Sequence, residues 1–375
     1  MKIETIAIHA GNQIDKGNKA VIQPITLSTT FERAEDGSYP SGYIYSRSNN
    51  PNRYSLENVL AKLENGAAAA AFSSGNAAGM TVFQSLDPGS HIICPDDMYH
   101  GLRNQLKQVF NKNLEFDFID MSDLGLVEAS IKPNTKLIWL ETPSNPLLKI
   151  TDIAAIVTIA KKTSVKTVCD NTFATPVLQR PLEMGADLVM HSTTKYLGGH
   201  SDVLGGALIA REANEWWLKL KQIQEMGGAV PSPFDCYMTV RGIKTLPYRM
   251  KGHVENTVKL ADFLENSLQV EAVFYPGSAS HPQYEIARKQ MSAGGGMLSF
   301  LVKGGAEEAR AVVNEVKIFT QATSLGGVES LIEHRASVEG PDTKTPQNLL
   351  RVSVGLENVD DLIEDLFIAL SSISN

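Results

Sequence analysis

Three stretches of the chain differ in how apolar and polar residues alternate. Residues 1–60 show little periodicity and many turn formers, such as Asp36-Gly37-Ser38 and Ser48-Asn49-Asn50-Pro51. This pattern predicts an irregular arm over residues 1–54. Irregular segments of such length are uncommon in a compact monomer, and they often carry function or reach a neighbouring subunit. We therefore expect the arm to contact another copy of the chain.

From residue 55 to residue 233 the pattern alternates between helix and strand. Short apolar runs bounded by polar residues predict strands buried on both faces, as in a parallel sheet. The predicted strands are His91–Cys94, Leu137–Leu140, Thr167–Cys169, Leu188–His191 and Gly206–Ala210, and the predicted helices are Ser55–Asn65, Asn76–Leu86, Tyr99–Phe110 and Asp152–Lys162. The small-residue run Ala67–Ala71 predicts a packed turn or a strand edge. The alternation predicts an α/β domain with helices on both faces of a mostly parallel sheet.

The pattern changes after residue 233. One long helical stretch, roughly Cys236–Ser267, is followed by two strand-like runs, Met297–Val302 and Leu349–Val354, and by an amphipathic helix near Val359–Leu370. Helices beside a few strands are typical of an α+β unit. Residues 234–375 are therefore expected to form a second, smaller domain.

Composition narrows the class of partner. Because 42 acidic residues outnumber 34 basic ones, a nucleic-acid or membrane-surface role is disfavoured and a small-molecule substrate is expected. The cysteines, Cys94, Cys169 and Cys236, are too few and too scattered for a disulfide framework or a zinc ribbon, and no metal site is expected. The first residues lack the apolar core of a signal peptide, and no apolar run reaches about 18 residues, which predicts a soluble cytoplasmic protein.

Residues that follow the predicted strands are candidates for chemistry, because open α/β sheets bind ligands at the carboxyl ends of their strands. Ser73-Ser74-Gly75-Asn76 follows the Ala-rich run and opens a predicted helix. Small residues there expose backbone N–H groups to an anion such as a phosphate, and the helix dipole favours its charge. The loop has neither the dinucleotide-binding nor the P-loop glycine pattern. An ordinary helix cap is the alternative interpretation.

Two ionisable residues follow later strands. Asp170 comes directly after Thr167–Cys169 and could pair with a cationic ring nitrogen, or serve as a helix cap or turn residue. Lys195 lies in the string from His191 to Asp202, among hydroxyl residues and glycines that suit phosphate contact. A lysine amine can form a Schiff base with a carbonyl compound. A solvated loop lysine is the alternative, which the whole string disfavours.

Together these three features describe a site for pyridoxal 5'-phosphate (PLP). In such a site a lysine holds the cofactor, an aspartate keeps the ring nitrogen protonated so that the ring accepts electrons, and a helix N-terminus holds the phosphate. Tyr99, after the strand His91–Cys94, could stack on the ring or be a core tyrosine. Arg351, in Leu349–Val354, could grip the carboxylate of an amino-acid substrate or face outward at a sheet edge.

The chain resembles the Cys/Met-metabolism PLP-dependent enzymes, a family that includes cystathionine γ-synthase, cystathionine γ-lyase, cystathionine β-lyase and methionine γ-lyase. The resemblance runs nearly the full length. It is carried by Thr5 to Gly11, Pro24 to Phe31, Tyr45-Ser46-Arg47, Asn50 to Arg53, the Ser74-Gly75 loop, Asp97, Tyr99, Glu141 to Pro146, Asp170 to Phe173, the Lys195 string, Ser324 to Gly327 and Arg351 to Glu357. It implies the type I fold of PLP-dependent transferases, which is similar to aspartate aminotransferase.

The resemblance also implies a role for each matching residue. Lys195 would hold PLP and move protons, and Tyr99 would stack on the ring and act as a second acid or base. The other cofactor contacts would come from Asp170, Ser74, Gly75, Asn76, Ser192 and Thr194, and from Tyr45 and Arg47 of a neighbouring subunit. The substrate α-carboxylate would be held by Asn145, Ser324 and Arg351. The family further implies a homodimer with shared active sites, usually assembled into a homotetramer.

Departures from the family pattern bear on specificity. Thr323 stands where enzymes specialised for γ-chemistry on cystathionine typically carry a glutamate, so a carboxylate that would recognise a distal ammonium group is missing. His100 replaces the first glycine of the familiar Tyr-Gly-Gly, and the segment from Glu333 to Gly340 replaces a Met-Thr-His segment. Together with Arg103 and Arg335, His100 could form a wall for the far end of the substrate. All three could instead be solvated loop residues.

These features predict a carbon–sulfur lyase of sulfur amino-acid metabolism, in transsulfuration or methionine biosynthesis. Because Thr323 replaces the glutamate, β-elimination of L-cystathionine to homocysteine, pyruvate and ammonia is placed ahead of γ-elimination or γ-replacement. In either route Lys195 would remove the α-proton. A protein of the same fold that binds a ligand without turnover is a more distant alternative, which the intact Lys195, Asp170 and Arg351 disfavour.

Overall fold

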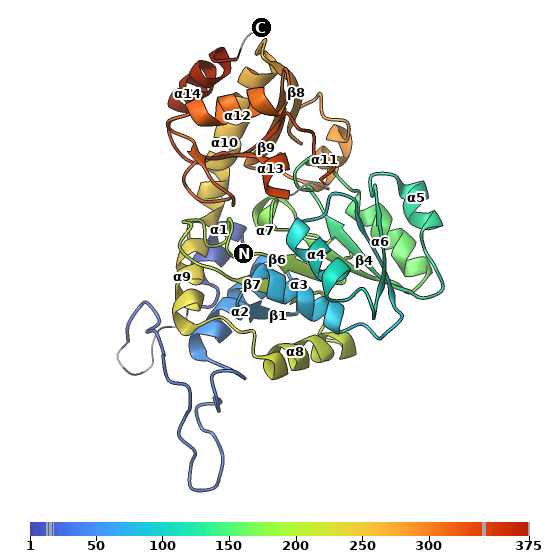
Figure 1. Ribbon diagram of the computed structural model, residues 1–375. Coiled ribbons are helices and arrows are strands. Elements are labelled where there is room, and N and C mark those ends of the chain that lie inside the picture. Colours follow the sequence, from blue (N-terminus) through green and yellow to red (C-terminus); the bar gives the residue numbers. More distant parts are fainter. Residues whose placement is uncertain (13, 15–16, 18, 340–342, 374–375) are drawn as a thin grey trace.

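The computed structural model in Figure 1 describes residues 1–12, 14, 17, 19–339 and 343–373. An α/β unit occupies the lower half of the view and an α+β unit the upper half, with the long helix α10 (Leu246–Glu265) running between them. An irregular arm projects below the α/β unit. The predicted α/β class is confirmed.

A seven-stranded sheet organises the lower unit within the described part of the chain. Its strands follow the order β1-β7-β6-β5-β4-β2-β3. Their bounds are β1 (Ala68–Phe72), β2 (His91–Pro95), β3 (Glu115–Ile119), β4 (Thr135–Glu141), β5 (Lys166–Asp170), β6 (Leu188–His191) and β7 (Gly206–Ala210). Strands β2 to β6 pair in parallel, whereas β7 is antiparallel to both β6 and β1. The sheet is therefore mostly parallel, as the apolar runs predicted, and the Ala-rich run is one of its edge strands.

Apolar residues on both faces of this sheet pack against the helices that cover it. Along β7, Ala207 and Ile209 belong to one buried cluster, whereas Leu208 and Ala210 belong to another. The helices of the lower unit are α2 (Pro51–Leu63), α3 (Gly75–Gln84), α4 (His100–Gln108), α5 (Leu124–Ala129), α6 (Ile153–Lys162), α7 (Thr175–Leu178) and α8 (Glu215–Gly227). The Asn50 side chain begins α2 by accepting hydrogen bonds from the first backbone N–H groups, so this helix starts before the predicted residue 55.

The single helix predicted over Cys236–Ser267 is not seen, and the first of the two helices found there packs against α2 in the lower unit. Two helices, α9 (Pro233–Ile243) and α10, cover this stretch. Pro247 lies in the first turn of α10, where its missing N–H costs nothing, whereas a continuous helix would place it in the interior. The remaining helices are α11 (Tyr284–Gln290), α12 (Ala306–Glu315), α13 (Arg335–Glu339) and α14 (Val359–Ser371).

The sheet of the upper unit has five strands in the described ranges, in the order β10-β11-β12-β9-β8. The strands are β8 (Val270–Phe274), β9 (Met297–Val302), β10 (Thr320–Gln321), β11 (Leu331–His334) and β12 (Leu349–Ser353). Three of its four pairings are antiparallel. Strand β12 is central, which places Arg351 in a buried strand rather than at the sheet edge considered from the sequence.

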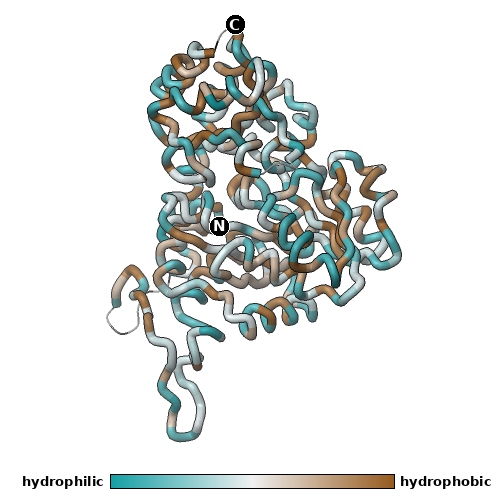
Figure 2. The backbone as a smooth tube through the Cα atoms, in the orientation of Figure 1, coloured by the Kyte–Doolittle hydropathy of each residue, from teal (hydrophilic) through white to brown (hydrophobic). Residues whose placement is uncertain are grey.

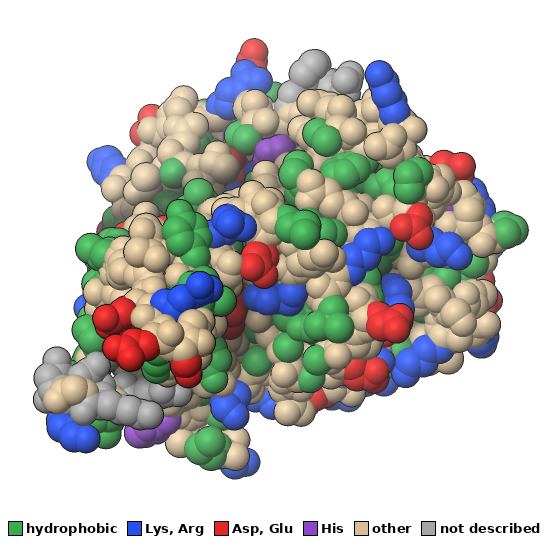
Figure 3. All heavy atoms as spheres, turned by 90° about the horizontal axis from the view of Figure 1, so that it is seen from below, with side chains coloured by type: hydrophobic (Ala, Val, Ile, Leu, Met, Phe, Trp, Pro, Cys, Tyr) green, Lys and Arg blue, Asp and Glu red, His purple; other side chains and the backbone are tan. Residues whose placement is uncertain are grey.

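The arm is not irregular from its first residue. Helix α1 (Ile3–His9) contacts α2 and α10, and Ala7 is buried against the body of the protein. Further along, the arm exposes apolar side chains, including Val21 and Leu27, and Figure 2 shows hydrophobic positions along it. On the face seen in Figure 3, basic and acidic side chains are interspersed.

Candidate active site

A cavity of about 330 Å³ lies at the carboxyl ends of the strands in the large sheet. Glu141 ends β4, Asp170 ends β5 and Ser192 follows β6. Strand β1 runs in the same direction, because both β1 and β6 are antiparallel to β7, and the loop with Ser74 follows it. These strands therefore deliver their terminal residues to one edge of the sheet.

Most of the residues predicted from the sequence to form the site line this cavity. Those that line it are Ser74, Gly75, Asn76, Tyr99, Asn145, Asp170, Ser192, Thr194, Lys195, Ser324 and Arg351. Tyr45 and Arg47 do not line it in their own chain. Arg47 instead donates a hydrogen bond of 3.0 Å from Nη1 to the carbonyl of Glu225, and its guanidinium lies over the Tyr45 ring. Their contact with a neighbouring subunit stays a prediction.

One end of the cavity fits a phosphate group. The Ser74 side chain caps α3 by accepting a hydrogen bond of 3.0 Å from the N–H of Ala77, so the helix N-terminus faces the cavity. A Cβ on Gly75 would lie 3.0 Å from the Cβ of Ser192, which leaves no room for a larger residue. The backbone can therefore approach an anion closely, with the Ser192 and Thr194 hydroxyls nearby.

Asp170 fits the ring nitrogen of PLP. Its Oδ1 accepts a hydrogen bond of 3.0 Å from the N–H of Thr172, which fixes the carboxyl group at the cavity wall. Burial raises the pKa of Asp170, so its ionised form needs a positive partner. A protonated pyridine nitrogen supplies that charge.

Lys195 lies between the cofactor end and the substrate end of the cavity. Its Nζ donates a hydrogen bond of 2.7 Å to the Oγ of Ser324, which comes from the upper unit. Burial, assisted by the guanidinium groups of Arg351 and Arg335, lowers the pKa of Lys195 to about 8. A substantial fraction of the amine is therefore neutral near physiological pH, as a nucleophile or a base requires.

Arg351 forms the substrate end with Asn145 and Ser324. Its Nη1 donates to Oδ1 of Asn145 at 3.0 Å, and its Nη2 donates to the carbonyl of Ser324 at 3.1 Å. The same Nη2 is 2.7 Å from Oε2 of Glu333. The guanidinium plane is thus held on several sides, which prepares it for two hydrogen bonds to an α-carboxylate.

Glu141 belongs to the site, although sequence reasoning assigned it no role. It is buried at the end of β4 and accepts a hydrogen bond of 2.8 Å from the backbone N–H of Tyr99. This bond fixes the start of α4 and with it the position of the Tyr99 ring. Burial and the nearby Asp170 raise the pKa of Glu141 well above its usual value. Its place directly after an apolar strand was the signal that could have identified it.

Comparison with known proteins points in the same direction as the site. A model of the family described as Cys/Met metabolism PLP-dependent enzyme matches residues 4–371. The chain belongs to this family. The predicted resemblance and the PLP cofactor are therefore confirmed.

Proteins similar to this chain carry three different names. Cystathionine γ-synthase from Mycobacterium leprae is 48% identical, over 98% of this chain and 97% of that protein. Cystathionine β-lyase from Coxiella burnetii is 44% identical, again over 98% and 97%. A crystal structure of cystathionine γ-lyase from Lactobacillus plantarum, complexed with L-serine, is 40% identical, with a TM-score of 0.95 over 100% of this chain and 99% of that one. The fold is thereby confirmed, and the family relationship leaves the type of carbon–sulfur chemistry open.

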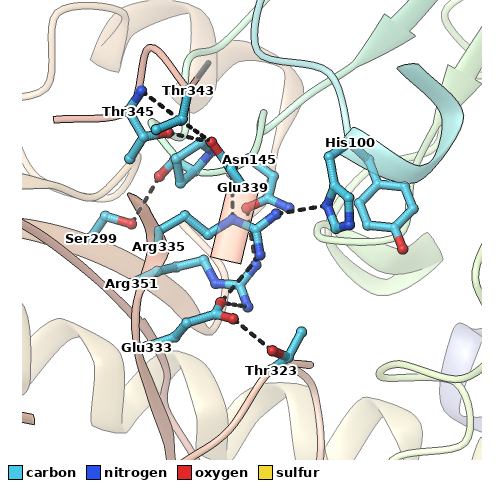
Figure 4. A network of polar contacts seen from close by, with 12 residues as sticks. His100, Asn145, Ser299, Thr323, Glu333, Arg335, Glu339, Thr343, Thr345 and Arg351 are labelled. Carbon is cyan, nitrogen blue, oxygen red and sulfur yellow. Dashed lines mark hydrogen bonds and ion pairs between the residues drawn. The ribbon is translucent and has the colours of Figure 1, made fainter. Parts of the chain in front are cut away.

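Glu333 places a carboxylate beside Thr323, although it does not line the cavity. The Thr323 hydroxyl donates a hydrogen bond of 2.8 Å to Oε1 of Glu333, ten residues later on β11. Oε2 of the same glutamate accepts from Nη1 of Arg335 at 3.2 Å and lies 2.7 Å from Nη2 of Arg351. Figure 4 shows the two guanidinium groups next to each other with Glu333 between them and Thr323. This carboxylate is fully engaged inside the protein.

His100 and Arg335 line the cavity, but Arg103 does not. The Nη1 of Arg103 donates to the carbonyl of Asp96 at 2.7 Å, and its guanidinium lies over the Phe118 ring. Of the two interpretations left open for Arg103, the structure contradicts a place in the substrate wall, because an aromatic ring and a backbone acceptor hold its guanidinium away from the cavity. Gly340, the last residue of the unusual segment, lies outside the described residues.

Membrane spans and metal clusters are both absent from the part of the chain that the structure describes. Within the described ranges, no helix is long and apolar enough to cross a membrane. The same ranges contain no group of three or more His, Cys, Asp or Glu side chains placed to hold a metal ion.

Proposed function

We propose that the protein is a carbon–sulfur lyase that cleaves an amino-acid thioether by β-elimination, with L-cystathionine as the first substrate to test. The observation that supports this most directly is the hydrogen bond between Lys195 and Ser324. This bond connects the proposed base, Lys195, to Ser324, whose carbonyl accepts a hydrogen bond from Arg351. A substrate α-carboxylate bound to Arg351 would therefore place the substrate α-carbon beside the Lys195 amine.

The residues of the chain divide the proton transfers between them. When bound, PLP provides a sink for the electron pair of the substrate Cα–H bond. Lys195 takes the α-proton on Nζ, and its pKa of about 8 suits a base that works near neutral pH. The bond between Cβ and sulfur then breaks, and its electron pair leaves with the sulfur.

Tyr99 is the proposed proton donor to the departing thiolate. Burial raises the pKa of the Tyr99 phenol, so the hydroxyl stays protonated at neutral pH. Its ring lines the cavity, and its backbone is held by Glu141. The thiol leaves as homocysteine, and the released 2-aminoacrylate takes up water to give pyruvate and ammonia.

Chemistry at the γ-carbon is the second candidate. It is favoured by the similarity to cystathionine γ-synthase at 48% identity and to a solved cystathionine γ-lyase. A γ-elimination needs a second proton to leave Cβ and yields 2-oxobutyrate and cysteine from cystathionine. Thr323 argues against γ-chemistry, because it brings no carboxylate to the cavity, and the neighbouring carboxylate of Glu333 is already paired with Arg335 and Arg351.

The deciding experiment gives L-cystathionine to the PLP-loaded protein and identifies the keto acid. We expect pyruvate together with homocysteine. Recovery of 2-oxobutyrate and cysteine would assign γ-elimination instead. If neither appears, an activated homoserine supplied with cysteine tests γ-replacement. A purified protein that takes up no PLP would revive the non-catalytic alternative.

We also propose that the arm completes the active site of a second copy of the chain, in a homodimer that pairs further into a tetramer. The support is that Tyr45 is 45% exposed and lies outside its own cavity. Deleting residues 1–49 should therefore reduce PLP affinity as well as the mass measured in solution. A truncated chain of unchanged mass and cofactor affinity would contradict this arrangement.

A further inference from the structure

The geometry points to Arg335 as the receptor for a carboxylate group at the far end of the substrate side chain. This inference rests on the proposed function, because it assumes that an amino acid occupies the cavity with its α-carboxylate on Arg351. It concerns the tail of that amino acid, beyond the bond that breaks.

The charged groups that line the cavity leave two guanidiniums for the substrate. The charged or ionisable side chains among its described lining residues are Tyr99, His100, Glu141, Asp170, Lys195, Arg335 and Arg351. Asp170 is assigned to the cofactor ring, and Lys195 to the cofactor aldehyde. Glu141 accepts the backbone N–H of Tyr99, and burial raises its pKa, which favours its neutral form. Arg351 and Arg335 are the fixed charges that remain.

The carboxylates that balance these arginines lie outside the cavity lining. Glu333 is buried behind both guanidiniums and also accepts the Thr323 hydroxyl. Glu339 accepts from Nε of Arg335 at 2.8 Å and from the Thr343 and Thr345 hydroxyls, and it lines a different cavity. Within the described residues, a substrate tail therefore meets N–H donors, whereas their counter-charges face away from it.

Arg335 keeps hydrogen-bonding capacity after its protein contacts are made. A guanidinium carries five N–H groups. Three of them are directed to Glu339, to Glu333 and, at 3.1 Å from Nη2, to Nδ1 of His100. Each terminal nitrogen retains one further N–H, so Arg335 can still donate two hydrogen bonds to a substrate carboxylate.

His100 is the weakest of the three partners and borders the cavity. Arg335 can only donate, so Nδ1 of His100 must accept and the ring proton lies on Nε2. Burial and the adjacent Arg335 charge lower the pKa of His100, which keeps the ring neutral. A neutral imidazole gives way to a carboxylate more readily than a glutamate does, and its Nε2–H is a further donor at the same wall.

The arrangement discriminates between tails by charge. A tail that ends in a carboxylate meets Arg335 and gains charge-assisted hydrogen bonds. A tail that ends in an ammonium group meets a guanidinium and, among the described lining residues, no ionised carboxylate besides the one assigned to the cofactor. A neutral apolar tail is expected to fall between them. The distal carboxylate of cystathionine can pair with Arg335, whereas its distal ammonium group gains no ion pair at this wall.

Three amino acids with the same six-carbon frame provide the test. L-2-Aminoadipate, L-norleucine and L-lysine carry an anionic, a neutral and a cationic tail, and none has a sulfur leaving group. Their dissociation constants from the PLP-loaded protein are measured from the absorbance change of the bound cofactor. We expect 2-aminoadipate to bind about 10- to 100-fold more tightly than norleucine, and lysine to bind more weakly than norleucine.

Variants distinguish an Arg335 that binds the substrate carboxylate from an Arg335 that only supports neighbouring residues. Arg335→Gln should remove the advantage of 2-aminoadipate and leave the norleucine constant within about threefold. Arg335→Lys keeps the charge without the planar fork, so it should restore part of that advantage. Arg351→Gln should weaken both ligands alike. Arg103→Gln is the matched control, because this arginine lies nearby but outside the cavity, and it should change neither constant.

Two results would overturn the inference. One is a wild-type protein that binds 2-aminoadipate no better than norleucine. The other is an Arg335→Gln variant that weakens both ligands equally, since that pattern belongs to a brace for Glu333 and Arg351. Failure of the proposed function looks different, because the charge preference would stand while cystathionine yields no keto acid. If none of the three amino acids binds, both ideas fail together.

Discussion

The two ends of the active-site cavity are built in different ways. At the cofactor end, the side chains lie at or within a few residues of the ends of strands in one mostly parallel sheet, and some of their contacts are with residues close in sequence, as between Ser74 and Ala77 or Asp170 and Thr172. At the substrate end, Arg351 contacts Asn145 across 206 positions, and Arg335 contacts His100 across 235. The first end depends on sheet topology, and the second depends on how the two units meet.

This difference separates general chemistry from specificity. The cofactor end presents a helix N-terminus, a carboxylate and an amine, the three groups that a PLP site uses. The substrate end is a charge network in which Glu333 serves two arginines at once. A change of one residue there is expected to alter which tail is accepted without disturbing the cofactor. Variants at each end can test this separation.

Lys195→Ala should reduce turnover of the natural substrate at least about 10³-fold, because it removes both the cofactor attachment and the proposed base. Keto-acid release measured at saturating substrate checks this. Lys161→Ala, an exposed lysine on α6, is the control and should keep full activity. Near-normal turnover in the Lys195 variant would refute the assignment.

Arg351→Gln should raise KM by roughly 100-fold while PLP affinity stays nearly unchanged. The lost contact is a bidentate, charge-assisted one to the α-carboxylate, and such hydrogen bonds contribute about 1.5–3 kcal/mol each. Steady-state kinetics together with a cofactor titration measure the two effects separately. A parallel loss of PLP affinity would show that the two ends are coupled rather than separate.

The rate of PLP uptake by the cofactor-free protein should rise about tenfold per pH unit below pH 8 and level off above it. The reactive species is the neutral amine, and burial lowers the pKa of Lys195 to about 8. Stopped-flow absorbance over pH 6–10 records the profile. Arg351→Gln removes a positive charge that lowers this pKa, so its profile should shift to higher pH. A wild-type rate still rising at pH 10 would contradict the expected pKa.

Gly75→Ala should weaken PLP binding by about tenfold without changing which tail the site prefers. The added methyl group would lie 3.0 Å from the Cβ of Ser192 and 3.2 Å from Cε of Met190, and such overpacking typically costs about 1–3 kcal/mol. Equilibrium titration with PLP gives the affinity. Gly227→Ala at the end of α8 is the matched control, since no atom lies within 4 Å of the place its methyl group would take. An equal loss in both variants would point to general destabilisation.

The sequence pattern correctly predicted the strands whose residues are almost all buried. Strands β6, β7 and β9 lie where their apolar runs predicted them, because strands buried on both faces or in a core are mostly apolar. The edge strand β3 (Glu115–Ile119) was missed, since its residues are only partly buried and mix charge with aromatic rings. Helix α1 was missed because seven residues carry too little periodicity to be recognised.

Residue order alone was enough to specify the α/β class, the cofactor and most of the predicted residues that line its cavity, because these depend largely on residues at or soon after the end of a strand in the chain. The substrate end, in contrast, takes its form only when the chain folds. Folding brings Glu333 to the hydroxyl of Thr323, turns Arg103 away and sets Arg335 beside His100. The contact of Arg335 with His100 joins the two units across 235 positions, and such pairing leaves no periodic trace in the order of the residues.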